Sequence, residues 1–267
     1  MKMKVAVIDK TGKKVSDFEI KLSEDVRDDI FKKAVISESS MFKQRTGSDP
    51  QAGKKQVINV SKRRRKLRTT YGRGGSRTPR KVMWGRGTQF RFVGAWASNT
   101  VGGRRAHPPR AEKVIYKDMN NKEWTKALRS GFTASMNNEL VLANGQEVPK
   151  TYPMILDDSI EKIAKTSEFV EFLDKLGFSN EVERISERKI KAGRGTMRNR
   201  SYKVKRGPLV VVSSLEAPLL KAVRNVRGFD IITPDLIMVS DFGMSEKPGR
   251  AVLFTKAALT EFNEVFE

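Results

Sequence analysis

Short apolar runs alternate along this chain with segments in which apolar residues recur every three or four positions, a pattern that predicts both strands and helices. Residues 5–8 are apolar, residues 15–22 largely alternate, and the sequence DKTGKK between them favours a turn, so we expect a β-hairpin. Ser23 is then a candidate helix cap. The apolar spacing that follows predicts a helix to about residue 42.

The middle of the chain predicts helices around one short strand. Small and apolar residues at helical spacing predict a long helix over 124–142, and an apolar strand is expected over 154–156. Asp158 and Glu161 have the spacing of a capping box. The pair Asp157–Asp158 is therefore interpreted as a helix cap and not as a pair of acid–base catalysts.

The last third of the chain alternates strands with helices. A helix capped by Ser167 and ended by Gly177 precedes it. Predicted strands cover 209–213, 229–232 and 251–254, and the helices after them begin at about 216, after Thr233 and after Thr255. The segment LIMVS that follows Asp235 also fits a strand. This order predicts an α/β fold with a mostly parallel, Rossmann-like central sheet and helices on both faces.

Positive charge is concentrated in two stretches of the chain. Seventeen Lys or Arg residues lie in 50–111 and nine in 188–207, and neither stretch contains Asp or Glu. The rest of the chain has 27 basic and 31 acidic residues, so the net charge of +22 belongs almost wholly to these two stretches. A slightly acidic body with two strongly basic attachments is typical of a protein that binds a polyanion.

The first basic stretch is not expected to fold alone. It combines its cations with nine glycines and isolated aromatics, and buries too little apolar surface to offset the entropy of ordering it. Many such runs are solvated tails, but this one lies inside the chain between two predicted helices. We therefore predict a globular α/β domain, residues 1–43 and 114–267, with a long basic loop, residues 44–113, inserted between two helices.

The sequence lacks the motifs of catalysis and nucleotide binding. GRG occurs three times, but Arg77, Phe90 and Arg198 stand where the dinucleotide fingerprint needs its third glycine, and no Walker-type sequence is present. His107 is the only histidine and there is no cysteine, so nucleophile–histidine catalysis and cysteine or histidine metal sites lack their parts. We expect no enzyme activity, no catalytic residue, no cofactor and no metal. His107 is interpreted as a contact or turn residue.

The cellular setting is expected to be cytoplasmic. No apolar run approaches the ~20 residues needed to cross a bilayer, and the first residues lack the apolar core of a signal peptide. The absence of cysteine agrees with a reducing compartment. The run KRRRK also fits a nuclear-localisation patch, but polyanion binding explains it without a second assumption.

The residue types of the basic stretches suit recognition of phosphates and bases. Arg presents a planar fork to phosphate oxygens, Lys presents a point charge, and Gly lets the backbone approach closely. Single aromatics are spaced through the first stretch, as base stacking requires, at Tyr71, Trp84, Phe90, Phe92 and Trp96. A small local core is the alternative role, chiefly for the last three of these aromatics.

Four segments carry a resemblance to a known family. They are GRGGSRTPRKVMWGRGTQF, GGRRAHPPRAEKV, IKAGRGTMRNRSYK and KPGRAVLFTKAAL. In this order they resemble the family of ribosomal protein four of the large subunit, in its archaeal and eukaryotic form, and the likeness covers essentially the whole chain. The length, without a long basic C-terminal extension, resembles the archaeal members.

The resemblance implies an RNA-binding α/β domain whose long loop extends into large-subunit RNA, with a tip beside the peptide exit tunnel. The expected RNA-binding residues of the loop are Lys62, Arg63, Arg64, Arg65, Lys66, Arg68, Tyr71, Arg73, Arg77, Arg80, Lys81, Trp84, Arg86, Arg91, Trp96, Arg104, Arg105, His107 and Arg110. Those expected on the tunnel side are Tyr71, Arg73, Arg77, Arg80, Trp84, Arg86 and Gln89. A second RNA face is expected at Arg188, Lys189, Lys191, Arg194, Arg198, Arg200, Lys203, Lys205 and Arg206.

The expected function is that of a structural constituent of the large ribosomal subunit that also supports its assembly. Its expected partners are large-subunit ribosomal RNA, neighbouring large-subunit proteins and the nascent polypeptide near the loop tip, with no membrane and no homo-oligomer. Two alternatives remain. One is an RNA-modifying or nucleotide-dependent enzyme on a Rossmann-like sheet, and the other is a free RNA chaperone.

Overall fold

The computed structural model describes residues 2–22, 25–58 and 61–266. The chain divides into two compact units. The first comprises Met1–Phe42 and Tyr116–Glu267 and is called the body; the second, Lys43–Ile115, is called the arm.

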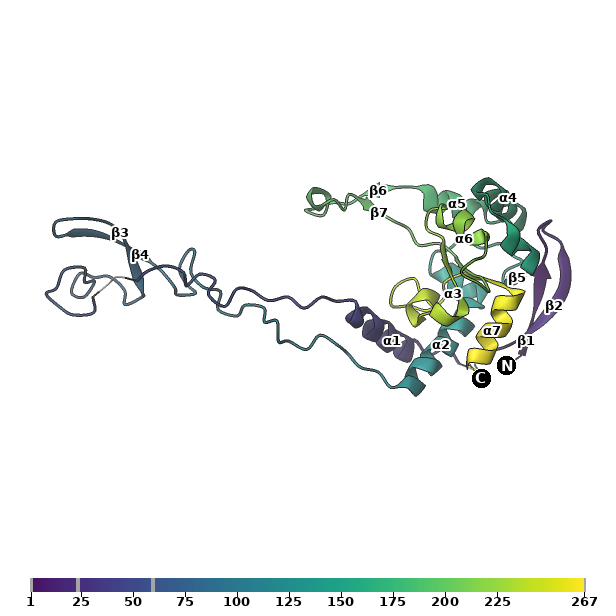
Figure 1. Cartoon of the computed structure of the whole chain (residues 1–267), viewed down its shortest axis with the longest axis horizontal. Helices are drawn as coiled ribbons and strands as arrows, with labels where there is room; N and C mark the ends of the chain where they lie inside the picture. The colour runs from purple at the N-terminus through teal and green to yellow at the C-terminus, as the bar shows by residue number, and fades with distance from the viewer. Residues whose placement is uncertain (1, 23–24, 59–60, 267) are drawn as a thin grey trace. The chain divides into compact units, whose positions relative to one another are not determined.

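A six-stranded sheet, counted over the described residues, forms the centre of the body in the order β2-β1-β5-β10-β8-β9. Its antiparallel pair, β1 and β2, is labelled in Figure 1. The strands are β1 (Lys2–Ile8), β2 (Lys14–Lys21), β5 (Met154–Leu156), β8 (Leu209–Val211), β9 (Asp230–Ile232) and β10 (Val252–Thr255). β1 and β2 pair antiparallel and the other neighbours pair parallel. The predicted hairpin and the mostly parallel sheet are thus confirmed.

Helices cover both faces of this sheet. They are α1 (Asp28–Met41), α2 (Asn121–Ser135), α3 (Asn138–Ala143), α4 (Thr166–Leu176), α5 (Ser179–Ser186), α6 (Leu219–Arg224) and α7 (Lys256–Phe266). Alternate strand residues enter two separate cores: Met154 and Leu156 pack in the core with α4 and α6, whereas Ile155 packs in the core with α1, α2 and α7. Burial on both sides explains why these strands read as continuous apolar runs.

The long helix predicted over 124–142 is wrong, because the chain forms two helices there. α2 ends at Ser135, and the side chain of Asn137 accepts a hydrogen bond from the backbone N of Glu139 at 3.0 Å. This bond satisfies a free backbone donor at the start of α3 and so restarts the helix.

Two predicted helix caps differ from the structure. Ser23 lies outside the described residues, and α1 begins after Arg27, whose backbone N donates to Ser130 Oγ of α2 at 2.7 Å. α4 begins at Thr166, so that Lys165 and not the predicted Ser167 stands at its N-cap position, without a side-chain capping bond. The predicted end at Gly177 is confirmed by a φ of +88°. The end of α4 depends on the backbone conformation of one glycine, which the sequence reveals. The start of α1 depends on a contact with α2, which the sequence does not reveal.

The capping box predicted at Asp158 and Glu161 is not formed. Asp157 accepts from the backbone N of Ser159 and caps the helix that begins there, as predicted. Asp158 instead accepts from the backbone N of Ala257, at the start of α7, at 2.8 Å. Glu161, in the 3-10 helix η1 (Asp158–Lys162), instead bonds groups at the ends of two strands.

Two further segments near the C-terminus are 3-10 helices. η3 (Pro234–Leu236) has the predicted cap residue Thr233 and Pro at its start. LIMVS is not a strand, since Leu236 belongs to η3 and Val239 and Ser240 belong to η4 (Val239–Phe242). The helix α5 was not predicted, because its charged sequence has few apolar residues beyond Val182 and Ile185.

A buried carboxylate ties η4 to the helices beneath it. Glu38 of α1 is only 7% exposed. It accepts hydrogen bonds from Trp124 Nε1 at 2.9 Å and from the backbone N atoms of Val239 at 2.8 Å and Ser240 at 2.9 Å. All three donors would be left without this acceptor if the carboxylate were removed.

Glu38→Ala is expected to lower the free energy of unfolding by about 2–4 kcal/mol, because buried donors left unsatisfied cost about 1–3 kcal/mol each and some regain water. Urea denaturation followed by circular dichroism measures the change. The control is Glu123→Gln, which breaks the exposed pair with Lys33 (2.6 Å) and should cost less than about 1 kcal/mol. Equal losses in the two variants would contradict the assigned role of Glu38.

Candidate RNA-binding surfaces

The chain leaves and re-enters the body at a set of serine hydrogen bonds on α1. Ser37 Oγ donates to the carbonyl of Lys117 at 2.6 Å, and the backbone N of Lys117 donates to Ser40 Oγ at 3.0 Å. Ser40 Oγ donates in turn to the carbonyl of Ser37 at 2.7 Å. The segment that returns from the arm is thereby fastened to the helix that leads into it. No periodic pattern in the sequence reveals these serines, since their partner is 77 to 80 residues away.

Inside the arm, the outgoing and returning segments run side by side. The backbone N of Ser48 donates to the carbonyl of Pro109 at 3.2 Å. A Cβ placed on Gly53, whose φ is +74°, would lie 2.5 Å from the backbone N of Arg104. Only a glycine permits this approach of two backbones. Gly53 therefore serves close packing within the arm.

The far part of the arm contains a hairpin that was not predicted. β3 (Arg80–Arg86) pairs antiparallel with β4 (Gln89–Gly94). The half-buried rings of Phe90 and Phe92 lie 6.1 Å apart, and the guanidinium of Arg68 lies 5.8 Å from the Phe90 ring. Gly85 is needed beside them, because a Cβ there would lie 2.7 Å from the Phe90 ring. The local-core alternative thus describes Phe90 and Phe92.

The two tryptophans of the arm are more exposed than these rings, and Tyr71 is half-buried. Trp84 is 52% and Trp96 40% exposed, and the indole N of Trp96 donates to the carbonyl of Gln56 at 2.7 Å. Tyr71 lies with the Arg77 guanidinium 5.8 Å from its ring. These side chains have room to contact a partner.

A small cavity brings five of the predicted RNA-binding residues together. It has a volume of about 270 Å³, and its lining includes Lys62, Tyr71, Arg77, Arg80 and Trp96. The guanidinium of Arg80 donates to the hydroxyl of Ser76 at 2.6 Å and so has a fixed direction. Cations and aromatic rings around one hollow suit a phosphate with its base.

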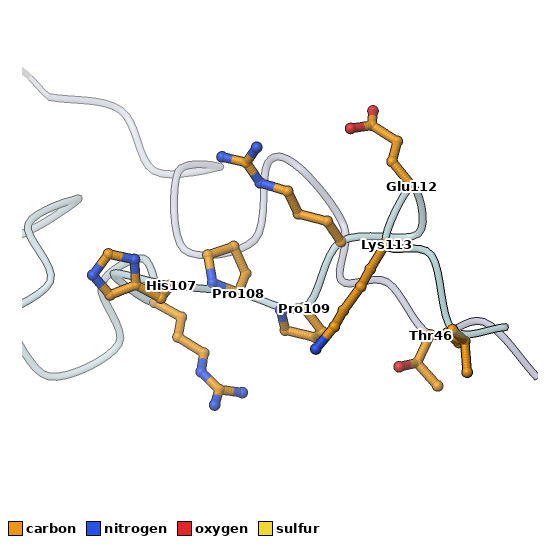
Figure 2. Close-up of a pocket in the computed structure, with 9 residues that line it drawn as sticks. Thr46, His107, Pro108, Pro109, Glu112 and Lys113 are labelled. Carbon is orange, nitrogen blue, oxygen red and sulfur yellow. The ribbon is translucent and has the colours of Figure 1, made fainter. Parts of the chain in front are cut away.

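A second hollow of the arm, of about 640 Å³, is lined by residues near its base. Figure 2 shows His107, Pro108 and Pro109 on one segment and Thr46 on the other. Arg105, Arg110 and Lys113 supply three cations to the lining against the single carboxylate of Glu112. The hollow contains His107 but no carboxylate–histidine–nucleophile arrangement among its lining residues.

The predicted cations of the arm are free to meet an external anion. All those from Lys62 to Arg110 are exposed except Arg80 and Lys81, which are half-buried. Within the described part of the chain, none of them forms an ion pair with a carboxylate. Mutual repulsion among unpaired cations is relieved by a polyanion.

The second basic stretch forms a short hairpin, which we call the ribbon and define as residues 188–204. Its strands are β6 (Lys189–Ile190) and β7 (Tyr202–Lys203), and it extends from the body beyond α5 (Figure 1). The guanidinium of Arg188 lies 5.1 Å from the ring centre of Tyr202. The sequence predicted the charge of this stretch but not its hairpin.

The C-terminal end of the ribbon is fastened to the body by two arginines. Arg206 donates to the carbonyls of Ser240 and Gly243, at 3.0 Å each, and contacts Asp241 at 3.1 Å. Arg206 was predicted to contact RNA, and these bonds engage its guanidinium in the body. Lys205, also predicted for RNA, pairs with Glu187 at 2.8 Å.

Arg250 is the buried centre of this attachment. It is 0% exposed and donates to the carbonyl of Gly207 at 2.6 Å and to Asp230 at 2.7 Å. Burial, followed by the charge of Arg206, lowers the pKa of Arg250 to about 10. Burial likewise raises the pKa of Asp241 above its ordinary value, against the pull of both arginines. Sequence reasoning missed Arg250, because its partners lie 9 to 43 residues away.

The glycines of the GRG motifs allow backbone conformations with positive φ. Gly72, Gly74 and Gly193 have φ values of +74°, +70° and +85°, a region that favours glycine.

Among the described residues, no group of three or more His, Cys, Asp or Glu side chains could hold a metal ion. In the same part of the chain, no helix is long and apolar enough to span a membrane.

A parallel α/β body with two exposed, glycine-rich cationic extensions has the features of a nucleic-acid-binding protein. The model of the ribosomal protein L4/L1 family matches residues 19–265, and the chain belongs to this family. The family predicted from the four sequence segments is thus confirmed.

Three archaeal relatives are similar over nearly the whole chain, and each is named large ribosomal subunit protein uL4. The relative from Nanoarchaeum equitans is 37% identical over 264 residues, 98% of each chain. That from Methanoregula boonei is 34% identical, covering 97% of this chain and 98% of its own. That from Sulfolobus acidocaldarius is 32% identical, covering 99% and 95%. These names agree with the prediction of an archaeal-type ribosomal protein and not an enzyme.

Arg250→Ala is expected to lower the free energy of unfolding by about 3–5 kcal/mol, because it leaves Asp230 and the carbonyl of Gly207 without their buried partner. Urea denaturation measures the change. Arg200→Ala removes an equal charge from the exposed ribbon and should alter the free energy by less than about 0.5 kcal/mol. Stability unchanged in Arg250→Ala would show that the attachment does not depend on this side chain.

Proposed function

We propose that this protein is a structural constituent of the large ribosomal subunit, in the cytoplasm, and that it binds large-subunit ribosomal RNA through the arm and the ribbon. The observation that carries the proposal is the segregation of exposed, unpaired cations onto these two extensions. Each cation that meets a phosphate releases a condensed counterion, so binding gains free energy without any core in the extension. Family membership supports the same role.

In the arm, the RNA contacts are proposed for the predicted residues from Lys62 to Arg110. Arginines there take backbone phosphates, and Tyr71, Trp84 and Trp96 take bases or apolar surfaces. The two tryptophans are exposed, and Tyr71 lines the small cavity of the arm. The arm has few buried apolar residues, so it gains much of its order from RNA. Ordering on binding would support assembly of the subunit.

In the ribbon, the phosphate contacts are proposed for Arg188, Lys189, Lys191, Arg194, Arg198, Arg200 and Lys203. Lys205 and Arg206 have carboxylate partners in the body, and we assign them to holding the ribbon in place. The ribbon and the arm would then contact separate segments of RNA.

The tip of the arm, within 71–89, is proposed to contribute to the wall of the peptide exit tunnel and to lie near the nascent polypeptide. The resemblance of the segment GRGGSRTPRKVMWGRGTQF supports this position. Neighbouring large-subunit proteins are proposed as partners of the body, and the protein is proposed to act without forming a homo-oligomer.

An enzyme that binds nucleotides is the competing function. Such enzymes on parallel sheets bind their ligand at the carboxyl ends of the strands. In this body Glu161 occupies the ends of β8 and β10, and its negative charge opposes a phosphate. Equilibrium dialysis with adenosine nucleotides and S-adenosylmethionine is expected to show no saturable binding.

Replacing Arg63, Arg64, Arg65 and Lys66 by Gln is expected to reduce the slope of log binding constant against log salt by about 3, at 0.7 to 0.9 for each phosphate that is no longer neutralised. Filter binding of the full chain to large-subunit ribosomal RNA between 50 and about 200 mM salt measures it. The control changes Lys13, Lys122, Lys126 and Lys150 to Gln, which removes the same charge from exposed sites of the body. A slope that is flat for the unaltered protein, or reduced equally by both sets, would overturn the proposal.

Replacing Pro50–Ala111 by a short Gly–Ser linker is expected to leave a body that unfolds cooperatively but no longer enters large subunits. The two cores lie wholly within the body, so the deletion removes none of their residues. Thermal unfolding and co-sedimentation with reconstituted large subunits at high salt measure the two properties. A deletion that melts the body would show that the arm belongs to its core, and normal incorporation would show that the arm is not the main RNA contact.

A further inference from the structure

The ribbon presents two chemically different faces. Successive side chains on a strand point to opposite sides, so the pairing of Ile190 with Tyr202 and of Lys189 with Lys203 assigns each pair to one face. By the same alternation, Arg188 and Val204 share the face of Tyr202. We call this the stacking face, and the side of Lys189 and Lys203 the cationic face.

The stacking face is apolar and uncovered. Ile190 is 72%, Val204 74% and Tyr202 46% exposed. Two strands of two residues each gain little from burial and are marginal by themselves. The fold of the body does not require apolar side chains at these positions, because they remain outside both of its cores.

The cationic face is unfavourable in the isolated protein. Lys189 and Lys203 lie directly across from each other, and like charges at opposed positions of a β-pair destabilise it. Both side chains are exposed, and neither forms an ion pair with a carboxylate in the described part of the chain. A phosphate placed between the two ammonium groups would remove this repulsion.

The Tyr202 ring already has a partner on one side. The Arg188 guanidinium lies 5.1 Å from the ring centre, which is within the range of a cation–π interaction. This interaction limits the orientations of the ring. The remaining exposed surface of the ring is then held ready for a second flat group.

We propose that the stacking face takes an unpaired base of ribosomal RNA on the Tyr202 ring, opposite Arg188, while Lys189 and Lys203 hold phosphates on the other face. Two faces of one thin ribbon reach a base and a backbone at once only where the ribbon lies between RNA segments. Paired bases of an A-form helix do not offer their flat surfaces, so the base must be unpaired. The proposal rests on the function proposed above and adds that the ribbon selects RNA with an unpaired base.

Photocrosslinking tests the contact at a single residue, even though the arm also binds RNA. The probe is a single-stranded RNA of about a dozen nucleotides, a length within the usual site sizes of single-strand binders, with 5-iodouridine at alternate positions. It is irradiated with the full-length protein, and the comparison is the same strand in a duplex. Mass spectrometry of the digested complex locates the crosslinks. We expect a crosslink at Tyr202 with the single strand, and we expect most of its yield to be lost with the duplex.

Variants separate stacking from charge. Tyr202→Phe keeps the ring and should keep the crosslink, whereas Arg188→Ala frees the ring and should lower its yield about fivefold. The matched control Arg224→Ala removes an exposed arginine from α6, outside both proposed RNA surfaces, and should lower the yield less than about twofold. Lys189→Gln with Lys203→Gln should lower the salt slope of binding by about 1.4 to 1.8.

The outcomes distinguish the two proposals. Crosslinks in the arm with none at Tyr202 would overturn the stacking proposal and leave the RNA-binding function intact. Equal crosslinking of Tyr202 to single strand and duplex would also overturn it, because selection of an unpaired base would be absent. Binding that does not weaken with salt would overturn the proposed function itself.

Discussion

The cost of burying unpaired charges is the physical constraint on which the arrangement of this protein depends. Two stretches of the chain hold 26 cations without a single carboxylate, and no folded core can bury such groups unpaired. The cations therefore lie on segments that remain outside the two cores of the body. Hydrogen bonds within the body hold the residues that flank the arm and those that follow the ribbon.

The two attachments are built from different chemistry. At the base of the arm, neutral serines on α1 bond the backbone of Lys117, so no charge is buried where the chain turns. At the base of the ribbon, Arg206 and Arg250 bond backbone carbonyls and both contact the carboxylate of Asp230. A buried guanidinium can bond several backbone carbonyls at once, which suits a segment whose own strands are only two residues long.

The sequence correctly predicted the elements that are defined by neighbouring residues in the chain. The hairpin β1–β2, the buried strands β5, β8 and β10, and the left-handed glycine after α4 follow from periodicity and residue type. The break between α2 and α3 was missed, because one Asn side chain outweighs a continuous apolar pattern. Glu38, Glu161 and Arg250 were missed for another reason. Their partners lie up to 202 residues away, and no spacing in the sequence reveals them.

Glu161 occupies the edge of the sheet at which many α/β proteins bind their ligands. Ligands of many α/β proteins bind in the crevice outside the carboxyl ends of the parallel strands. Here Glu161 accepts from the backbone N and the hydroxyl of Ser213, at 2.9 and 2.8 Å, and from the hydroxyl of Thr255 at 2.7 Å. The carboxylate satisfies these donors from within the chain and adds a negative charge where a phosphate would approach. With this edge closed to phosphates, the exposed cations of the arm and the ribbon remain as the surfaces suited to a polyanion.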